Sequence, residues 1–117
     1  MTGRHRWFLP DTPDVLGMLH GQFEVTLDGV RALARWADEG GAPDAALAVR
    51  DAEHRADTCK LELRRALRAA FSTPIDSEDI YMISERLENV MNETKDTVRE
   101  AEQIGRASCR ERVLPGV

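Results

Sequence analysis

The chain has little of several residue types on which common architectures and sites depend. Aromatic residues make up 5% of its 117 residues, and it has two cysteines, Cys59 and Cys109. Two cysteines supply neither a disulfide framework nor the ligand spacing of a zinc site. Charged residues reach 32%, and this composition suits a helical bundle better than a β-sandwich. The net charge of -5 argues against a nucleic-acid-binding protein.

Long apolar runs are also missing. No segment approaches the roughly 20 apolar residues of a membrane-spanning helix, which argues against direct membrane insertion. Residues 1–6 are basic, but the apolar residues that follow end at Pro10, so the chain lacks the apolar region of a signal peptide. These absences predict a soluble cytoplasmic protein.

The length allows one domain. We expect residues 1–9 to form an N-terminal arm whose aromatic side chains pack on the domain, and residues 10–103 to form a helical bundle. Residues 104–117 are expected to be a disordered tail, because helical periodicity is lost there. This tail resembles translated read-through of a DNA-sequencing adapter, which predicts that the gene was truncated near Gln103 and that Cys109 is not native. The alternative is a genuine unstructured terminus.

Start and stop signals divide the bundle into three helices. Thr12 is placed to cap the first helix, with Pro13 as its first residue. Gly40 and Gly41 are expected to end this helix, and Pro43 opens the second.

The third helix is preceded by its own signals. The second helix is predicted to end near Phe71, because Pro74 disfavours helix at the residue before it. Asp76 is a good N-cap, so the third helix is expected to begin at Ser77. Connections this short place neighbouring helices antiparallel, and the sequence predicts an all-α, antiparallel three-helix bundle.

Each predicted helix carries apolar residues at three- and four-residue steps, which is one face of a helix. On the second helix most of these residues are small, so a neighbour can approach closely. The predicted core positions are Leu16, Leu19, Phe23, Leu27, Val30, Leu33 and Ala37; then Val49, Ala52, Ala56, Cys59, Leu63, Ala66 and Ala70; then Ile80, Ile83, Leu87, Val90, Met91, Thr94 and Val98.

Two pairs of oxygen-bearing side chains are candidate metal ligands. Glu53 and Asp57 are spaced i, i+4 on the flank of the second helix, and Glu88 and Asn92 have the same spacing on the third. Carboxylate pairs of this kind suit hard or borderline metal ions. The two strips either face one another or both turn outward, and the sequence leaves this open. The alternative to a metal site is a set of exposed charges in ion pairs.

Two further groups of side chains are candidate partner-binding surfaces. Lys60, Arg64, Arg65 and Arg68 form a basic strip near the end of the second helix, suited to an acidic loop or a phosphate group. The alternative is a solvated face that complements the helix dipole. On the third helix, Lys95, Asp96 and Arg99 form the other surface, with local helix ion pairs as its alternative.

No catalytic signature is found. The histidines, His5, His20 and His54, are scattered, and none stands at a recognisable spacing from a nucleophile. A glycine-rich phosphate-binding loop is absent from the sequence. We therefore expect a protein that is not an enzyme.

Five segments together carry a resemblance to a known family: residues 6–10, 53–57, 71–80, 87–90 and 92–100. With these segments the chain resembles the PhoU-like family of phosphate-transport accessory proteins, which are encoded beside Pit-type inorganic phosphate transporters. The resemblance implies a helical bundle that regulates such a transporter from the cytoplasm, at the inner face of the membrane. It also implies a longer chain with a second helical bundle.

The resemblance further implies a metal cofactor, iron or another divalent or trivalent ion. Glu53 and Asp57 match one of the family's acidic repeats, and Glu88 matches the first position of another. Asn92 departs from the family pattern, because it replaces a carboxylate.

Two alternatives belong to other functional classes. A carboxylate metal-storage bundle would need Glu-x-x-His pairs directed into its core, and the sequence has none. A plain oligomerisation module, a homo-oligomer, is favoured only by the small residues of the second helix.

Overall fold

The structure is a computed structural model that describes residues 13–70, 73 and 75–113, of which residues 106–113 are described by their backbone alone. Its three helices are α1 (Val15–Asp38), α2 (Pro43–Ala69) and α3 (Ser77–Val113). No strand occurs in this part of the chain. The predicted all-α, three-helix bundle is thereby confirmed. The expected arm at residues 1–9 lies outside the described residues.

α1 begins later than predicted. Its N-cap is Asp14, whose Oδ1 accepts a hydrogen bond of 2.9 Å from the backbone N–H of Gly17. The prediction of Thr12 as cap and Pro13 as first helical residue was therefore wrong, because the next capping side chain along the chain takes this role.

The other helix boundaries follow the local signals. Gly40 and Gly41 have φ values of 69° and 90°, a left-handed conformation that glycine adopts without steric cost. Pro43 opens α2. The side chain of Asp76 accepts a hydrogen bond of 3.0 Å from the N–H of Glu78, which is the predicted cap of α3.

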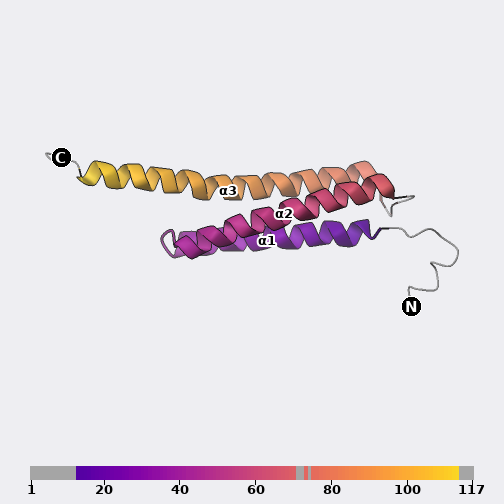
Figure 1. Cartoon of the computed structure of the whole chain (residues 1–117), viewed down its shortest axis with the longest axis horizontal. Coiled ribbons are helices and arrows are strands. Elements are labelled where there is room, and N and C mark those ends of the chain that lie inside the picture. The colour runs from indigo at the N-terminus through magenta and orange to yellow at the C-terminus, as the bar shows by residue number, and fades with distance from the viewer. Residues whose placement is uncertain (1–12, 71–72, 74, 114–117) are drawn as a thin grey trace.

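α3 continues to Val113, well past the predicted end near Gln103, so the expectation of a disordered tail from residue 104 differs from the structure. Residues 106–112 include Arg, Ala and Glu, which have good helix propensity. Extending an existing helix adds one hydrogen bond for each residue fixed. This extension runs beyond the α1–α2 connection (Figure 1).

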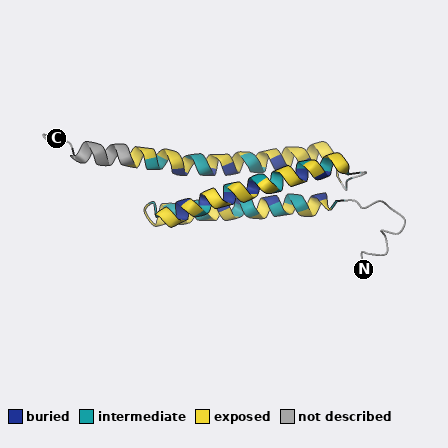
Figure 2. Ribbon diagram, viewed as in Figure 1, coloured by how far each residue is buried: buried dark blue, intermediate teal, exposed yellow. Residues whose placement is uncertain are grey.

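α1 and α2 form an antiparallel pair, and α3 lies along both of them (Figure 1). The predicted stripe of α2 is mostly buried, with Cys59 and Ala70 half-buried; Figure 2 colours the buried positions dark blue. Small residues dominate it, which lets α1 approach closely. The fully or nearly buried residues of α2 are Ala45, Ala46, Val49, Ala52, Ala56, Leu63 and Ala66.

The inward face of α1 differs from the prediction. Leu16, Phe23 and Val30 are exposed, with 40%, 46% and 37% of their surface accessible. Gln22 and Thr26 are buried in their place. A buried polar side chain needs hydrogen-bond partners. Gln22 has one in Ser84 of α3, and the hydroxyl of Thr26 donates to the carbonyl of Gln22 within α1.

α3 departs from the prediction in the same way. Ile83 and Val90 are each 44% exposed, whereas Ser84 is fully buried. Ile80, Met91, Thr94 and Val98 are buried as predicted. An apolar row therefore remains on the outside of both α1 and α3.

Candidate functional site

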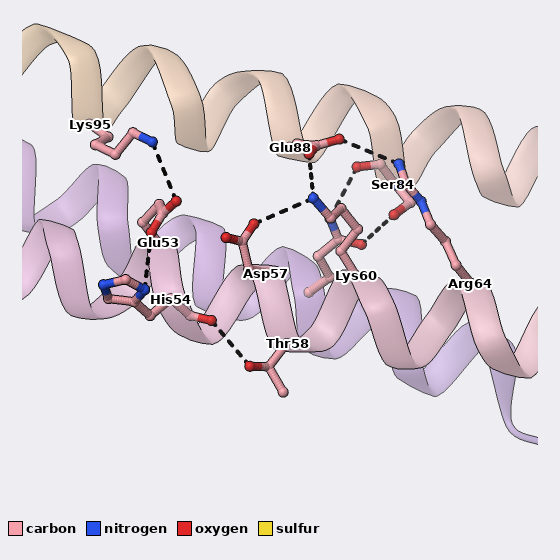
Figure 3. Close-up of polar contacts among 10 residues, drawn as sticks. Glu53, His54, Asp57, Thr58, Lys60, Arg64, Ser84, Glu88 and Lys95 are labelled. Carbon is pink, nitrogen blue, oxygen red and sulfur yellow. Dashed lines mark hydrogen bonds and ion pairs between the residues drawn. The ribbon is translucent and has the colours of Figure 1, made fainter.

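The strips of α2 and α3 that carry the predicted metal ligands face one another, which answers the question that the sequence left open. Nζ of Lys95 lies 3.4 Å from Oε1 of Glu53, and Nζ of Lys60 lies 3.4 Å from Oδ1 of Asp57. Lys60 also bonds Glu88 across the two helices. We call these five residues, Glu53, Asp57, Lys60, Glu88 and Lys95, the α2–α3 seam (Figure 3).

Three of the predicted ligands come together at the seam. Asp57, Glu88 and Asn92 line one small cavity of about 10 Å³, and Lys60 lines it with them. The ammonium group of Lys60 already supplies a positive charge between Asp57 and Glu88. Its hydrogen bond to Glu88 raises the pKa of Lys60, which keeps the group protonated.

A metal ion does not fit this cavity while Lys60 occupies it. Glu53 does not line the cavity. Its Oε1 lies 3.4 Å from Nζ of Lys95, and its Oε2 lies 3.4 Å from Nδ1 of His54. Within the residues that the structure describes, no three His, Cys, Asp or Glu side chains converge. Metal binding thus requires Lys60 to move away, and it stays a prediction.

The predicted basic strip of α2 divides into two parts. Lys60 belongs to the seam, and Arg64 adjoins it, since a terminal nitrogen of Arg64 lies 3.4 Å from Oε1 of Glu88. The guanidinium of Arg64 also lies over the ring of Tyr81, 4.7 Å from its centroid, a cation–π contact. Arg65 and Arg68 are exposed and take part in no ion pair within the described part of the chain.

Arg65 and Arg68 border an open hollow of about 660 Å³ between the end of α2 and the start of α3. We call it the arginine hollow. It combines three guanidinium groups with apolar and aromatic surface, and Leu61 and Tyr81 are 55% and 41% exposed. Its lining residues are Leu61, Arg64, Arg65, Leu67, Arg68, Ser77, Glu78 and Tyr81.

Leu61 and Tyr81 were missed as site residues. Both lie outside the apolar stripes of their helices, and large apolar residues at such positions were the available signal. Their combination in one hollow depends on how α2 and α3 cross, which the sequence does not show.

The predicted surface of α3 separates as well. Lys95 belongs to the seam, whereas Arg99 forms a local ion pair of 2.6 Å with Asp96, three residues earlier on the same exposed side of α3. The side chains of this pair are 60% and 42% exposed. Such a pair is what the alternative of local helix pairing describes.

Cys59 is half-buried in the stripe of α2. Burial, together with the nearby charge of Glu62, raises the pKa of its thiol. A raised pKa lowers the fraction of thiolate, which is the nucleophilic form. The surroundings of Cys59 therefore favour its thiol form over the reactive thiolate.

Comparison of the chain with protein-family models, with curated proteins and with solved structures finds no match. Within the described residues, none of the helices combines the length and apolar character that crossing a membrane requires.

Proposed function

We propose that this chain is a non-enzymatic accessory protein of an inorganic phosphate transporter, acting in the cytoplasm by binding its membrane partner. The observation that carries the proposal is the arginine hollow, which is open, basic and partly apolar. The choice of transporter rests on the resemblance to PhoU-like proteins.

The chemistry of the hollow favours an acidic, amphipathic protein segment. Arg65 and Arg68 offer guanidinium groups that bind carboxylates through two parallel hydrogen bonds. Leu61 and Tyr81 offer exposed apolar surface beside them, and arginine and aromatic residues are enriched in binding hot spots. The N-terminus of α3 adds its positive dipole to the same place.

The test is binding of the full chain to the Pit-type transporter of the same genome, held in lipid nanodiscs. The variant Arg65→Glu/Arg68→Glu reverses two exposed charges at the hollow. The matched control, Arg35→Glu/Arg55→Glu, makes the same charge change at two exposed arginines elsewhere. We expect the hollow variant to weaken binding at least about tenfold, equivalent to about 1.4 kcal/mol, and the control to retain most of it. Equal loss in both variants, or no binding by the wild type, would overturn the proposal.

A second candidate function, metal binding, is favoured by the meeting of Asp57, Glu88 and Asn92 around one cation position. The variant Lys60→Met removes the competing ammonium group. On this hypothesis the iron content of the purified variant rises above that of the wild type, and a further Glu88→Gln change removes the gain. Unchanged iron content after reconstitution would contradict it.

A further inference from the structure

Two apolar rows on the outside of the bundle have no partner within the described residues. On α1 the row is Leu16, Phe23 and Val30, and on α3 it is Ile83 and Val90. Successive members of each row are spaced by seven residues, the repeat with which a helix presents one seam to a packed neighbour.

The two rows lie side by side. Gln22 of α1 forms hydrogen bonds with Ser84 of α3. Seven residues further along both helices, Gly29 of α1 faces Met91 of α3. Residues of the rows are sequence neighbours of these contacts. Phe23 follows Gln22, and Ile83 precedes Ser84. Val30 follows Gly29, and Val90 precedes Met91.

Both rows lie on the side of the bundle away from α2. α1 is paired to α2 through Asp28 and Arg35, and at 100° per residue these positions lie about 120–160° around the helix from Phe23 and Val30. On α3 the groups paired to α2 include Glu88 and Lys95.

These groups of α3 lie about 120–160° around the helix from Ile83 and Val90. The rows therefore form one apolar face over α1 and α3, which we call the α1–α3 face.

Charged residues border this face in a self-complementary order. On the outer side of α1 are Glu24 and then Arg31, and on the outer side of α3 are Arg86 and then Glu93. All four are exposed. Glu24 and Arg86 each follow the Gln22–Ser84 contact by two residues, and Arg31 and Glu93 each follow the Gly29–Met91 contact by two. Opposite charges therefore stand at equal heights on the two helices.

We propose that the α1–α3 face binds a second copy of this chain about a two-fold axis parallel to the helices. The axis places α1 of one copy along α3 of the other in the same direction. Phe23 then packs on Ile83 of the second copy, Glu24 pairs with Arg86 of the second copy, and Arg31 pairs with Glu93 of the second copy. A symmetric interface of this kind requires a self-complementary patch, and the order of charges provides it.

The size of the face sets the strength of the association. The exposed row of α1 is about 20 Å long, and an interface on two such helices belongs to the small, transient class below about 1,200 Å² in total. We therefore expect a dimer with a dissociation constant in the micromolar range. The arginine hollow lies elsewhere, between α2 and α3, so this inference stands apart from the proposed function.

Sedimentation velocity of the full chain, from about 1 to about 100 µM, tests the proposal. The wild type is expected to shift from monomer to dimer over this range, and Val90→Glu to remain monomeric. The matched control is Leu47→Glu, which alters a 60% exposed residue of α2, and it should dimerise like the wild type. Circular dichroism checks that each variant is helical. A wild type that is monomeric throughout, or a control that dissociates like Val90→Glu, would overturn the proposal.

A charge exchange tests the pairing itself. Glu24→Arg alone is expected to weaken dimerisation, because it places two arginines together, and Glu24→Arg/Arg86→Glu is expected to restore it. Failure of the double variant to recover would contradict the proposed arrangement of the two copies. Both variants change only exposed side chains, so their outcome does not depend on repacking of the core.

Discussion

Lys60 is the residue whose surroundings explain most about the α2–α3 seam. Its side chain is 13% exposed and contacts Asp57 on its own helix and Glu88 on α3. Because burial of an unpaired charge is costly, an ammonium group and a carboxylate can be brought this far inside only as partners. The same pairing occupies the position that a metal would need.

The first prediction concerns the pH dependence of Lys60→Met. The hydrogen bond to Glu88 raises the pKa of Lys60 above its ordinary value of 10.5, so folding favours the protonated form. The stabilisation is therefore fully present below about pH 10.5 and is lost as the pH rises through the higher pKa of the folded state. At pH 8 we expect the variant to lower the free energy of unfolding by about 1 kcal/mol.

This difference should shrink above pH 10.5, the ordinary pKa of the group, as measured by urea unfolding of both proteins. Arg99→Met is the control, since it removes an exposed ion pair of little expected value. A difference between wild type and Lys60→Met that stays constant, or grows, up to pH 11 would contradict this account.

The second prediction concerns the buried pair of Gln22 and Ser84. The hydroxyl of Ser84 donates to Oε1 of Gln22 at 2.6 Å, and Nε2 of Gln22 donates to the carbonyl of Ser84 at 3.0 Å. Ser84→Ala leaves a buried oxygen unsatisfied and should cost about 1–3 kcal/mol. In a Gln22→Leu background the same change should cost much less, because that oxygen is gone. Thermal and urea unfolding of the four proteins give the coupling, and additive effects would argue against the pair.

The helices show which features of the fold the sequence predicts. Helix ends depend on residues close in sequence, and the predicted boundary signals Gly40, Gly41, Pro43 and Asp76 are confirmed. The face that each helix buries depends on its neighbours in space, and there the apolar pattern of α1 was misleading. Its strongest row, with Phe23, lies outside, while Gln22 lies inside because Ser84 satisfies it.

The candidate site was predictable to the same extent. The i, i+4 spacing of Glu53 and Asp57 placed them on one strip of α2 without knowledge of the fold. That Lys60 would stand between Asp57 and Glu88 depends on the rotation of α2 against α3, which spacing along one helix does not determine. Prediction of the arginine hollow also requires the relative rotation of α2 and α3.

The third prediction compares two glycines of α1. A Cβ at Gly29 would lie 2.6 Å from Cε of Met91 and 3.3 Å from Cβ of Ala52. Because Met91 is itself buried, Gly29→Ala should lower the free energy of unfolding by about 1–2 kcal/mol. A Cβ at Gly21 meets nothing within 4 Å, so Gly21→Ala should raise it by up to about 1 kcal/mol through helix propensity. Chemical unfolding measures both, and equal effects would refute the close approach of α1 to α3.

At the scale of the whole molecule, three surfaces differ in what they bind. The α2–α3 seam joins two helices through ion pairs, and the α1–α3 face is proposed to bind a second copy. The arginine hollow is proposed to bind the transporter. The small-residue stripe of α2, which favoured an oligomerisation module in the sequence, is buried within the chain against α1 and is not available to a partner.

Hydrogen–deuterium exchange of the chain, alone and with the transporter in nanodiscs, tests the central claim most directly. The concentration of the chain is held equal in both samples, so that self-association is the same. The account predicts slower exchange in residues 61–68 and 77–81, which line the arginine hollow, and the loss of this protection in Arg65→Glu/Arg68→Glu. Protection confined to α1, or no protection under conditions in which the two proteins bind, would contradict it.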